Sequence, residues 1–306
     1  PPVHILVLNY NSLEKTAACV ANLERLNYRN FRLVLLDNDS PDGSGGELRR
    51  RFSAHEVVLN GRNIGYAAGI NVGIRLALER GAALIWLLNP DMLVDPDALG
   101  AMLDVHASLP KPGLIGSLQL SDESDRIWFY KGVITREGKV RHAHVDEPRS
   151  QVPELALVTA GEGDFVNGAS MLFSRRVVEE VGLIPEDYFL YYEDVDWSLR
   201  VAARGFQNRV AYRSLVRHMH GGPRANYVTE YYSRRNEYFF RRRHGFAVSR
   251  ANTLARLRIR MAKYAVRAFL GRRADHHRNM YYVIGRVAAA IKEDRMGYER
   301  LELPRP

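Results

Sequence analysis

Short apolar runs alternate with helical patterns in the first third of the chain. Residues 4–8, 31–36 and 83–88 are nearly continuous apolar runs, which predict strands covered on both faces of a sheet. Apolar positions recur at helical spacing over residues 13–23 and 70–78. Strand–helix–strand units of this length predict an α/β fold, with a doubly wound, mostly parallel central sheet and flanking helices.

The pattern changes after residue 114. Residues 126–130 and 133–135 predict antiparallel strands, and residues 136–139 a turn after the second of them. Further helices are predicted at 177–181 and 195–203.

Beyond residue 227 the chain is predicted to be helical. One segment carries an apolar stripe flanked by arginines, formed by Leu254, Leu257, Met261, Tyr264 and Ala268. Such a stripe commonly packs against its own domain. A helix of this kind can also lie on an anionic membrane, so both interpretations stay open.

Composition narrows the class of protein. The chain of 306 residues is 46% hydrophobic and 26% charged, so it can bury a substantial core and is not predicted to be disordered or fibrous. No apolar run comes near the roughly 18 residues of a transmembrane helix. The first residues resemble a strand and not a secretory signal, and the single Cys19 cannot form an internal disulfide. We therefore expect a cytoplasmic enzyme.

Positive charge is concentrated towards the C-terminus. The formal net charge is +9, but the residues from Arg224 onward carry 20 basic and 7 acidic side chains, a net charge of +13. The preceding residues carry 24 basic and 28 acidic side chains, a net charge of −4. This shift predicts a main domain at 1–222 and a basic helical C-terminal extension at 223–306. The excess of positive charge in this extension points to an anionic partner: nucleic acid, a phospholipid surface or a phosphorylated ligand.

Polar residues follow each of the three predicted strands: Asn9 and Asn11, then Asp37, then Asn89 and Asp91. Ligands of such sheets bind at the carboxyl ends of the strands, so these residues are candidates for one site. No glycine-rich phosphate loop follows the first strand, which disfavours a nicotinamide dinucleotide or P-loop site. Side chains such as Asp37 would then bind a nucleotide, and Asp91 offers an oxygen ligand for Mg²⁺ or Mn²⁺ that holds the phosphates.

Two further clusters carry possible chemistry. Glu193, Asp194 and Asp196 lie at the start of a predicted helix, where they can cap it or supply a general base. His218 and His220 follow an apolar run and share one face of an extended strand, so either could bind a metal or be surface residues only.

The sequence resembles family 2 glycosyltransferases of the GT-A (Rossmann-like) fold, particularly their rhamnosyltransferase-like branch. The matching stretches keep the family order between about residues 3 and 243. They are residues 8–12, 36–44, 63–71, 88–91, 167–172, 192–197, 218 and 235–236.

The resemblance implies a nucleotide-binding half at about 1–113 and an acceptor half at about 114–222. It implies that six residues bind the nucleotide: Asn9, Asn11, Asp37, Asn63, Asn71 and Asn89. Asn89 stands in place of the first Asp of the family's Asp-x-Asp metal motif. The metal ligands would be Asp91 and His218, with His220 as the alternate.

The same resemblance assigns the catalytic base to Asp194, with Glu193 and Asp196 as its acidic neighbours. Arg235 resembles a diphosphate contact. Three residues are candidates for the acceptor side: Gly168, Ala169 and Trp197. Further candidates for lining the sugar pocket are Arg126, Trp128 and Asp164.

The predicted activity is inverting, metal-dependent transfer of a sugar from a nucleotide-sugar donor, with dTDP-rhamnose favoured. The acceptor would be a saccharide or a lipid-linked saccharide in bacterial surface polysaccharide synthesis. A UDP- or GDP-linked sugar and a soluble acceptor remain the alternative. The basic extension suggests peripheral attachment to the inner face of the cytoplasmic membrane, with a homodimer as another possibility. A nucleic-acid-binding protein is disfavoured, because the main body is acidic and the extension has no recognised nucleic-acid motif.

Overall fold

The computed structural model describes residues 1–121, 124–152, 164–219, 227–271, 273–299, 301 and 303. The chain divides into two compact units. The first contains Pro1–Thr135, Val140–Pro185 and Asp194–Gly221. The second contains Arg136–Lys139, Glu186–Glu193 and Gly222–Pro306. The second unit therefore includes two short segments from within the predicted main domain.

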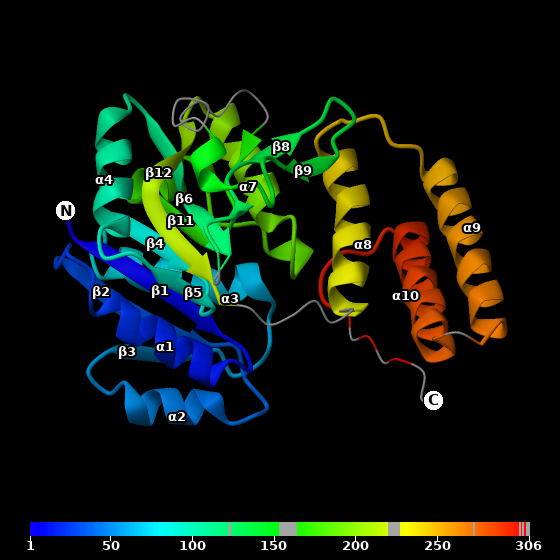
Figure 1. The fold of residues 1–306 in the computed structure, drawn as a ribbon, viewed down its shortest axis with the longest axis horizontal. Helices are drawn as coiled ribbons and strands as arrows, with labels where there is room; N and C mark the ends of the chain where they lie inside the picture. The colour runs from blue at the N-terminus through cyan, green and yellow to red at the C-terminus, as the bar shows by residue number, and fades with distance from the viewer. Residues whose placement is uncertain are drawn as a thin grey trace. The chain divides into compact units, whose positions relative to one another are not determined.

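In the described residues, the first unit is built on a sheet of nine strands in the order β3-β2-β1-β4-β11-β6-β12-β5, with β7 paired to β6 (Figure 1). β1 to β4, β6 and β12 run in one direction, and β5, β7 and β11 run against them. The strand bounds are β1 Val3–Asn9, β2 Phe31–Asp37, β3 Glu56–Leu59, β4 Leu84–Leu88, β5 Met92–Val94, β6 Pro112–Ser121, β7 Ile127–Phe129, β11 Ser170–Ser174 and β12 Gln207–His218.

Helices cover both faces of this sheet. Along β1, Ile5 and Val7 point into a core shared with α1 Leu13–Leu23, α2 Ser44–Arg51 and α4 Ala98–Ser108. Leu6 and Leu8 point into a second core shared with α3 Tyr66–Glu79, α6 Arg175–Val181 and α7 Glu193–Ala203. Because alternate residues of one strand enter two cores, the strand is apolar throughout, as its sequence predicted. The predicted α/β fold with a mostly parallel sheet is confirmed.

A second, small antiparallel sheet has the strand order β10-β8-β9. It consists of β8 Gly132–Ile134, β9 Val140–His142 and β10 Asp164–Phe165. The predicted turn at 136–139 joins β8 to β9, and a short 3₁₀ helix follows at Arg149–Gln151. A Cβ atom on Gly132 would lie 1.8 Å from the Phe165 ring, so only glycine fits this position.

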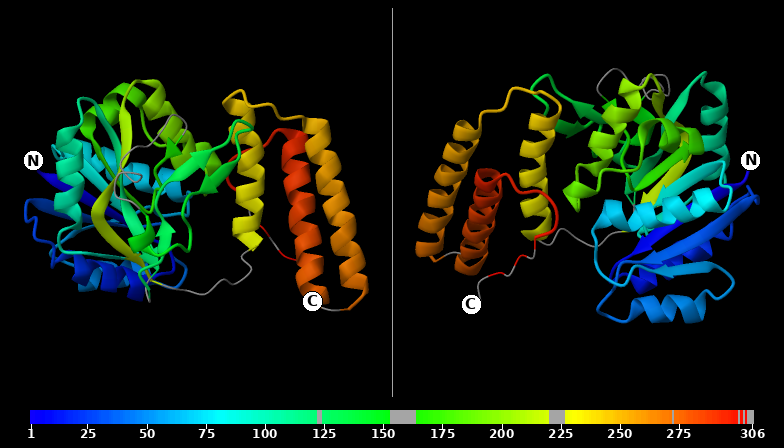
Figure 2. Two further views of the ribbon diagram at one scale, coloured as in Figure 1. Left: turned by 45° about the horizontal axis from the view of Figure 1, so that its top comes forward. Right: turned by 180° about the vertical axis from the view of Figure 1, so that it is seen from behind.

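The second unit contains a 3₁₀ turn, Glu186–Tyr188, and three long helices: α8 Tyr227–Arg243, α9 Arg250–Phe269 and α10 Ala274–Glu293 (Figure 2). Leu257 of α9 packs with Tyr232, Phe239 and Val283 in a separate core. Leu254, Met261 and Tyr264 are partly buried against the same core. The predicted stripe of α9 therefore packs within its own unit. None of the described helices is long and apolar enough to cross a bilayer.

Candidate active site

Asn9 and Asp37 meet at the carboxyl ends of two adjacent parallel strands. The Asn9 side chain donates to Asp37 Oδ1 over 2.7 Å and to Ser44 Oγ over 2.8 Å, and it accepts from Thr16 over 2.8 Å. Asp37 Oδ2 accepts from the Ser40 backbone N–H over 2.9 Å. Both side chains are almost fully buried, so this network forms the base of the predicted nucleotide site.

Two more predicted nucleotide residues lie beside this network. Asn11 is exposed, has φ of 50°, and donates its backbone N–H to Ser40 Oγ over 3.0 Å. Asn63 Oδ1 accepts from the Asn38 side chain over 2.9 Å and from the Gly65 N–H over 3.0 Å. The segment before α3 is thereby held against the end of β2.

Asn71 lies deeper than the prediction required. It is fully buried in α3, and its amide donates to the Ile184 carbonyl over 2.8 Å and accepts from the Ile184 N–H over 3.3 Å. Contact with a ligand would need these hydrogen bonds to break. We therefore do not expect Asn71 to contact the nucleotide.

The turn between β4 and β5 carries Asn89 and Asp91. Asn89 is half-buried, and its N–H donates to the Ala169 carbonyl over 2.9 Å. The β5–β12 pairing sets Met92 opposite His218, which brings His218 Nε2 to 3.4 Å from Asp91 Oδ2. The other Asp91 carboxylate oxygen is buried and has no hydrogen-bond partner among the described residues. Asp91 and His218 are thus brought together, with one carboxylate oxygen available to a ligand.

These two side chains fit a divalent cation that takes its other ligands from a substrate or from water. Mg²⁺ is commonly bound in this way, through few protein groups together with phosphate oxygens. Within the described ranges, no three His, Cys, Asp or Glu side chains gather closely enough to hold a metal by themselves. Burial and the nearby Asp91 charge raise the pKa of Cys19 to about 12. His220, the alternate ligand, lies outside the described residues.

Two residues that flank His218 add to the site. Trp128 of β7 stacks on the His218 ring, with centroids 4.9 Å apart and planes at 29°, and remains 44% exposed. Lys15 of α1, which the sequence analysis missed, donates to the Met219 carbonyl over 3.3 Å. No motif marks this lysine, because its position depends on β12 reaching the start of α1. Of the other pocket candidates, Arg126 pairs with Asp146, and Asp164 begins β10.

Asp194 lies in the first turn of α7 and is partly exposed. Its Oδ2 accepts from the Gly168 N–H over 3.0 Å, and its Oδ1 accepts from the Val195 N–H over 2.8 Å. Withdrawal of this carboxyl from water raises its pKa above the ordinary aspartate value, and the two hydrogen bonds oppose part of that rise. An oriented carboxylate with a raised pKa can serve as a general base.

The neighbouring acidic residues are placed differently. Asp196 is fully buried and pairs with Arg200 one turn later in α7, and Glu193 is also buried. Trp197, predicted on the acceptor side, is fully buried in the core, where its ring meets Phe173 edge-on. The cluster therefore exposes Asp194 more than its two acidic neighbours.

Gly168 and Ala169 connect Asp194 to the turn that carries Asn89 and Asp91. The Gly168 N–H binds Asp194, and the Gly168 carbonyl accepts from the Tyr66 hydroxyl over 2.9 Å. Ala169 accepts from the Asn89 N–H. A Cβ atom on Gly168 would lie 3.4 Å from Asp194 Cβ, in ordinary van der Waals contact with it. The predicted acceptor-side residues thus support both chemical groups through their backbone.

Arg235 lies in the second unit, where it is 1% exposed. Its guanidinium donates to the carbonyls of Tyr188 and Gly297 over 2.9 and 2.6 Å. The adjacent Asn236 amide nitrogen lies 2.8 Å from the carbonyls of both Leu190 and Tyr191. These contacts favour a structural role for Arg235, and a diphosphate contact would require them to break.

The chain belongs to glycosyl transferase family 2, because residues 4–182 match that family, more than half of the chain. A low-salt glycan biosynthesis hexosyltransferase, Agl10, of Haloferax volcanii is 26% identical over 201 residues, 64% of this chain and 60% of the relative. The dTDP-rhamnosyl transferase RfbF of Shigella flexneri is 27% identical over 200 residues, 65% of this chain and 62% of the relative. The chain therefore spans about three-fifths of the length of these two relatives.

Two other comparisons extend these findings. An N-acetylglucosaminyl-diphospho-decaprenol L-rhamnosyltransferase of Mycobacterium tuberculosis is 24% identical over 220 residues, 66% of this chain and 71% of the relative. A mannosyltransferase of Pyrobaculum calidifontis, solved with GDP-Man and Mn²⁺, has a TM-score of 0.61 at 15% identity and covers 96% of this chain and 88% of its own. This likeness shows that the fold is GT-A, as predicted.

Two adjacent glycines of α2 differ in the space around them. A Cβ atom on Gly45 would lie 2.6 Å from Asp37 Oδ2, whereas Gly46 has open space around it. We expect Gly45→Ala to displace the Asp37 carboxylate and lower the free energy of unfolding by about 1–3 kcal/mol. Gly46→Ala, the matched control, should raise it by up to about 1 kcal/mol. Urea unfolding measures both, and equal effects of the two substitutions would contradict the tight packing at Asp37.

Proposed function

We propose that this chain is an inverting, metal-dependent glycosyltransferase that moves a sugar from a nucleotide-sugar donor to an acceptor hydroxyl. One observation carries the proposal: the turn that bears Asp91 and the carboxylate of Asp194 are hydrogen-bonded to adjacent residues, Ala169 and Gly168. One site therefore contains both a group that can hold a diphosphate through a cation and a group that can accept a proton.

Asp194 acts as the general base. Its carboxylate accepts the proton of the acceptor hydroxyl while the acceptor oxygen forms a bond to the anomeric carbon. The bond from that carbon to the diphosphate oxygen breaks on the opposite side, so the anomeric configuration inverts. One displacement needs no second carboxylate as nucleophile, which agrees with the burial of Glu193 and Asp196.

Asp91 and His218 would hold a divalent cation, which would supply positive charge to stabilise the diphosphate leaving group. Lys15 supplies a nearby positive charge, since its ammonium group binds the residue directly after His218. We assign it the diphosphate role that the resemblance gave to Arg235. Asn9, Asp37 and Asn63 form the nucleotide end of the site, with Asn11 at its exposed edge.

Rhamnose is the favoured sugar, because two of the named relatives are rhamnosyltransferases. The mycobacterial relative is named for an acceptor that carries a lipid diphosphate, which supports a lipid-linked saccharide as the acceptor. The relative from Haloferax is named only as a hexosyltransferase, so a UDP- or GDP-linked sugar is the alternative.

The proton-transfer role is tested with Asp194→Asn. The amide can still accept the Gly168 hydrogen bond but cannot accept a proton, so kcat should fall about 10²–10⁴-fold with little change in KM for the donor. In the unsubstituted enzyme only the carboxylate form is active. The raised pKa of Asp194 therefore predicts that kcat/KM falls with acidity at a pH above the ordinary aspartate range.

Steady-state rates across pH measure both effects. A matched control is Asp187→Asn, which removes an acidic group from a surface ion pair with Arg243 in the second unit. It should retain the rate within about twofold, since exposed pairs contribute little. Normal transfer by Asp194→Asn with several donors would rule out this base.

The metal role is tested by binding, without turnover. Asp91→Ala and His218→Ala should each weaken Mn²⁺ binding in the presence of a nucleoside diphosphate at least ~10-fold, because each removes a ligand. Electron paramagnetic resonance of free Mn²⁺ measures this directly. Asp95→Ala removes an exposed carboxylate four residues away and should leave Mn²⁺ binding unchanged. Unaltered binding in both site variants would place the cation elsewhere.

The donor is tested with a panel of nucleotide sugars and Mn²⁺. A ligand at 100 times its Kd stabilises the native state by about 2.7 kcal/mol, so the correct donor should raise Tm measurably. We expect dTDP-rhamnose to give the largest shift, and mass spectrometry should detect rhamnose on a lipid-diphosphate saccharide. Faster transfer from a UDP- or GDP-sugar would reject rhamnose while keeping the reaction class.

A further inference from the structure

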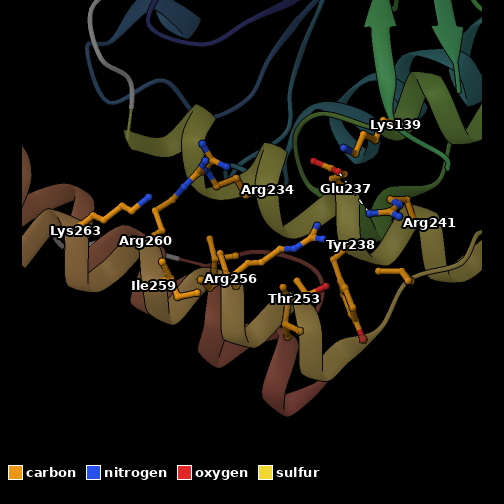
Figure 3. A pocket seen from close by; sticks show the side chains of 14 residues that line it. Lys139, Arg234, Glu237, Tyr238, Arg241, Thr253, Arg256, Ile259, Arg260 and Lys263 are labelled. Carbon is orange, nitrogen blue, oxygen red and sulfur yellow. Dashed lines mark ion pairs between the residues drawn. The ribbon is translucent and has the colours of Figure 1, made fainter.

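A groove lies between α8 and α9 of the second unit (Figure 3). Its volume is about 390 Å³. Val287 and Ile291 of α10 add apolar surface to it, and both other helices contribute basic side chains to its lining. Figure 3 shows Arg234 reaching from α8 towards Arg260 of α9, so like charges share one space.

The basic side chains of α8 already have acidic partners. Arg234 pairs with Glu230 in the preceding turn, and Arg241 lies 3.8 Å from Glu237. Arg241 also donates to the Glu137 carbonyl over 2.7 Å. These arginines are therefore neutralised or tethered within the unit.

Three basic side chains of α9 have no acidic partner among the residues that the structure describes. Arg256, Arg260 and Lys263 line the groove, are exposed, and make no ion pair or hydrogen bond with the residues that the structure describes. The helix holds no Asp or Glu anywhere along its length. Mutual repulsion makes such a row costly unless an anion lies between the charges.

Beside this row, α9 presents an apolar stripe to solvent. Ile259 and Val266 are each 59% exposed, Ala262 lies between them on the same face, and Leu270 is 72% exposed just past the helix end. The inner stripe packs on α10, so these residues form a second, outward stripe. Apolar side chains flanked by arginine and lysine on a helix surface are typical of binding at a membrane interface.

We infer that the groove binds the phosphate head group of an anionic lipid at a membrane surface, with the outward stripe of α9 against the acyl chains. The phosphate places negative charge between Arg256, Arg260 and Lys263, which have no ion-pair partner among the residues that the structure describes. The lipid, in contrast to free phosphate, also covers Ile259 and Val266. This binding goes beyond the proposed transfer reaction and does not depend on it, so each can fail while the other stands.

Vesicle co-sedimentation of the full chain tests the inference. We expect binding to phosphatidylcholine vesicles that contain phosphatidylglycerol, and at least ~10-fold weaker binding to phosphatidylcholine alone, because the cations need anionic lipid. Arg256→Glu with Arg260→Glu should weaken binding to the mixed vesicles at least ~20-fold. Arg25→Glu with Arg49→Glu, exposed residues of the first unit, makes the same change in net charge and should alter binding less than about twofold.

A second pair of variants separates lipid from free phosphate. Ile259→Ser with Val266→Ser should weaken vesicle binding several-fold and leave the affinity for inorganic phosphate, measured by calorimetry, unchanged. Circular dichroism checks that every variant keeps its helices. Equal binding to both kinds of vesicle, no vesicle binding, or equal losses in the two arginine pairs would overturn the inference. Vesicle binding that the serine pair leaves intact, or tighter binding to a DNA duplex than to vesicles, would overturn it as well.

Discussion

The antiparallel pairing of β11 with β4 is the constraint on which the candidate site depends. Ser170 lies opposite Leu88, so the residues just before β11 reach the turn that follows β4. There Ala169 binds the Asn89 N–H, and the next residue back, Gly168, binds Asp194. Buried hydroxyl contacts fix this register, since Ser170 binds both Trp86 of β4 and Ser117 of β6. A slip of one residue would move Met171 and Leu172 each into the opposite core and separate the two chemical groups.

Burial and hydrogen bonding act in opposite directions at Asp194, and both are needed. Withdrawal from water favours the protonated carboxyl, whereas the backbone N–H groups of Gly168 and Val195 favour the carboxylate. A fully solvated carboxylate would be a weaker base, and a buried one with an arginine partner, such as Asp196, would keep its charge in an ion pair. The same α7 turn thus gives adjacent acidic residues different properties.

The sequence predicted those parts of the site that follow from strand ends, and not those that depend on long-range contacts. Apolar runs and the rule for parallel sheets predicted that Asn9, Asp37 and Asp91 follow strand ends, where the structure has them, and their binding roles stay predictions. The sequence alone could not distinguish Asn71 from these residues. It does not show that the Asn71 amide is hydrogen-bonded to the Ile184 backbone. The position of Lys15 beside Met219 joins residues 204 positions apart and leaves no local signal.

Arg235 and Asn236 make contacts that favour a structural role. Phe189, Tyr191 and Tyr192 have φ of 67°, 66° and 76°, a left-handed conformation that costs bulky residues about 1–2 kcal/mol each. Arg235 and Asn236 bind the carbonyls of this strained segment, which runs into Glu193 at the start of α7. Their hydrogen bonds offset the strain within this segment. A buried arginine in this role needs no phosphate, because backbone carbonyls already accept its hydrogen bonds.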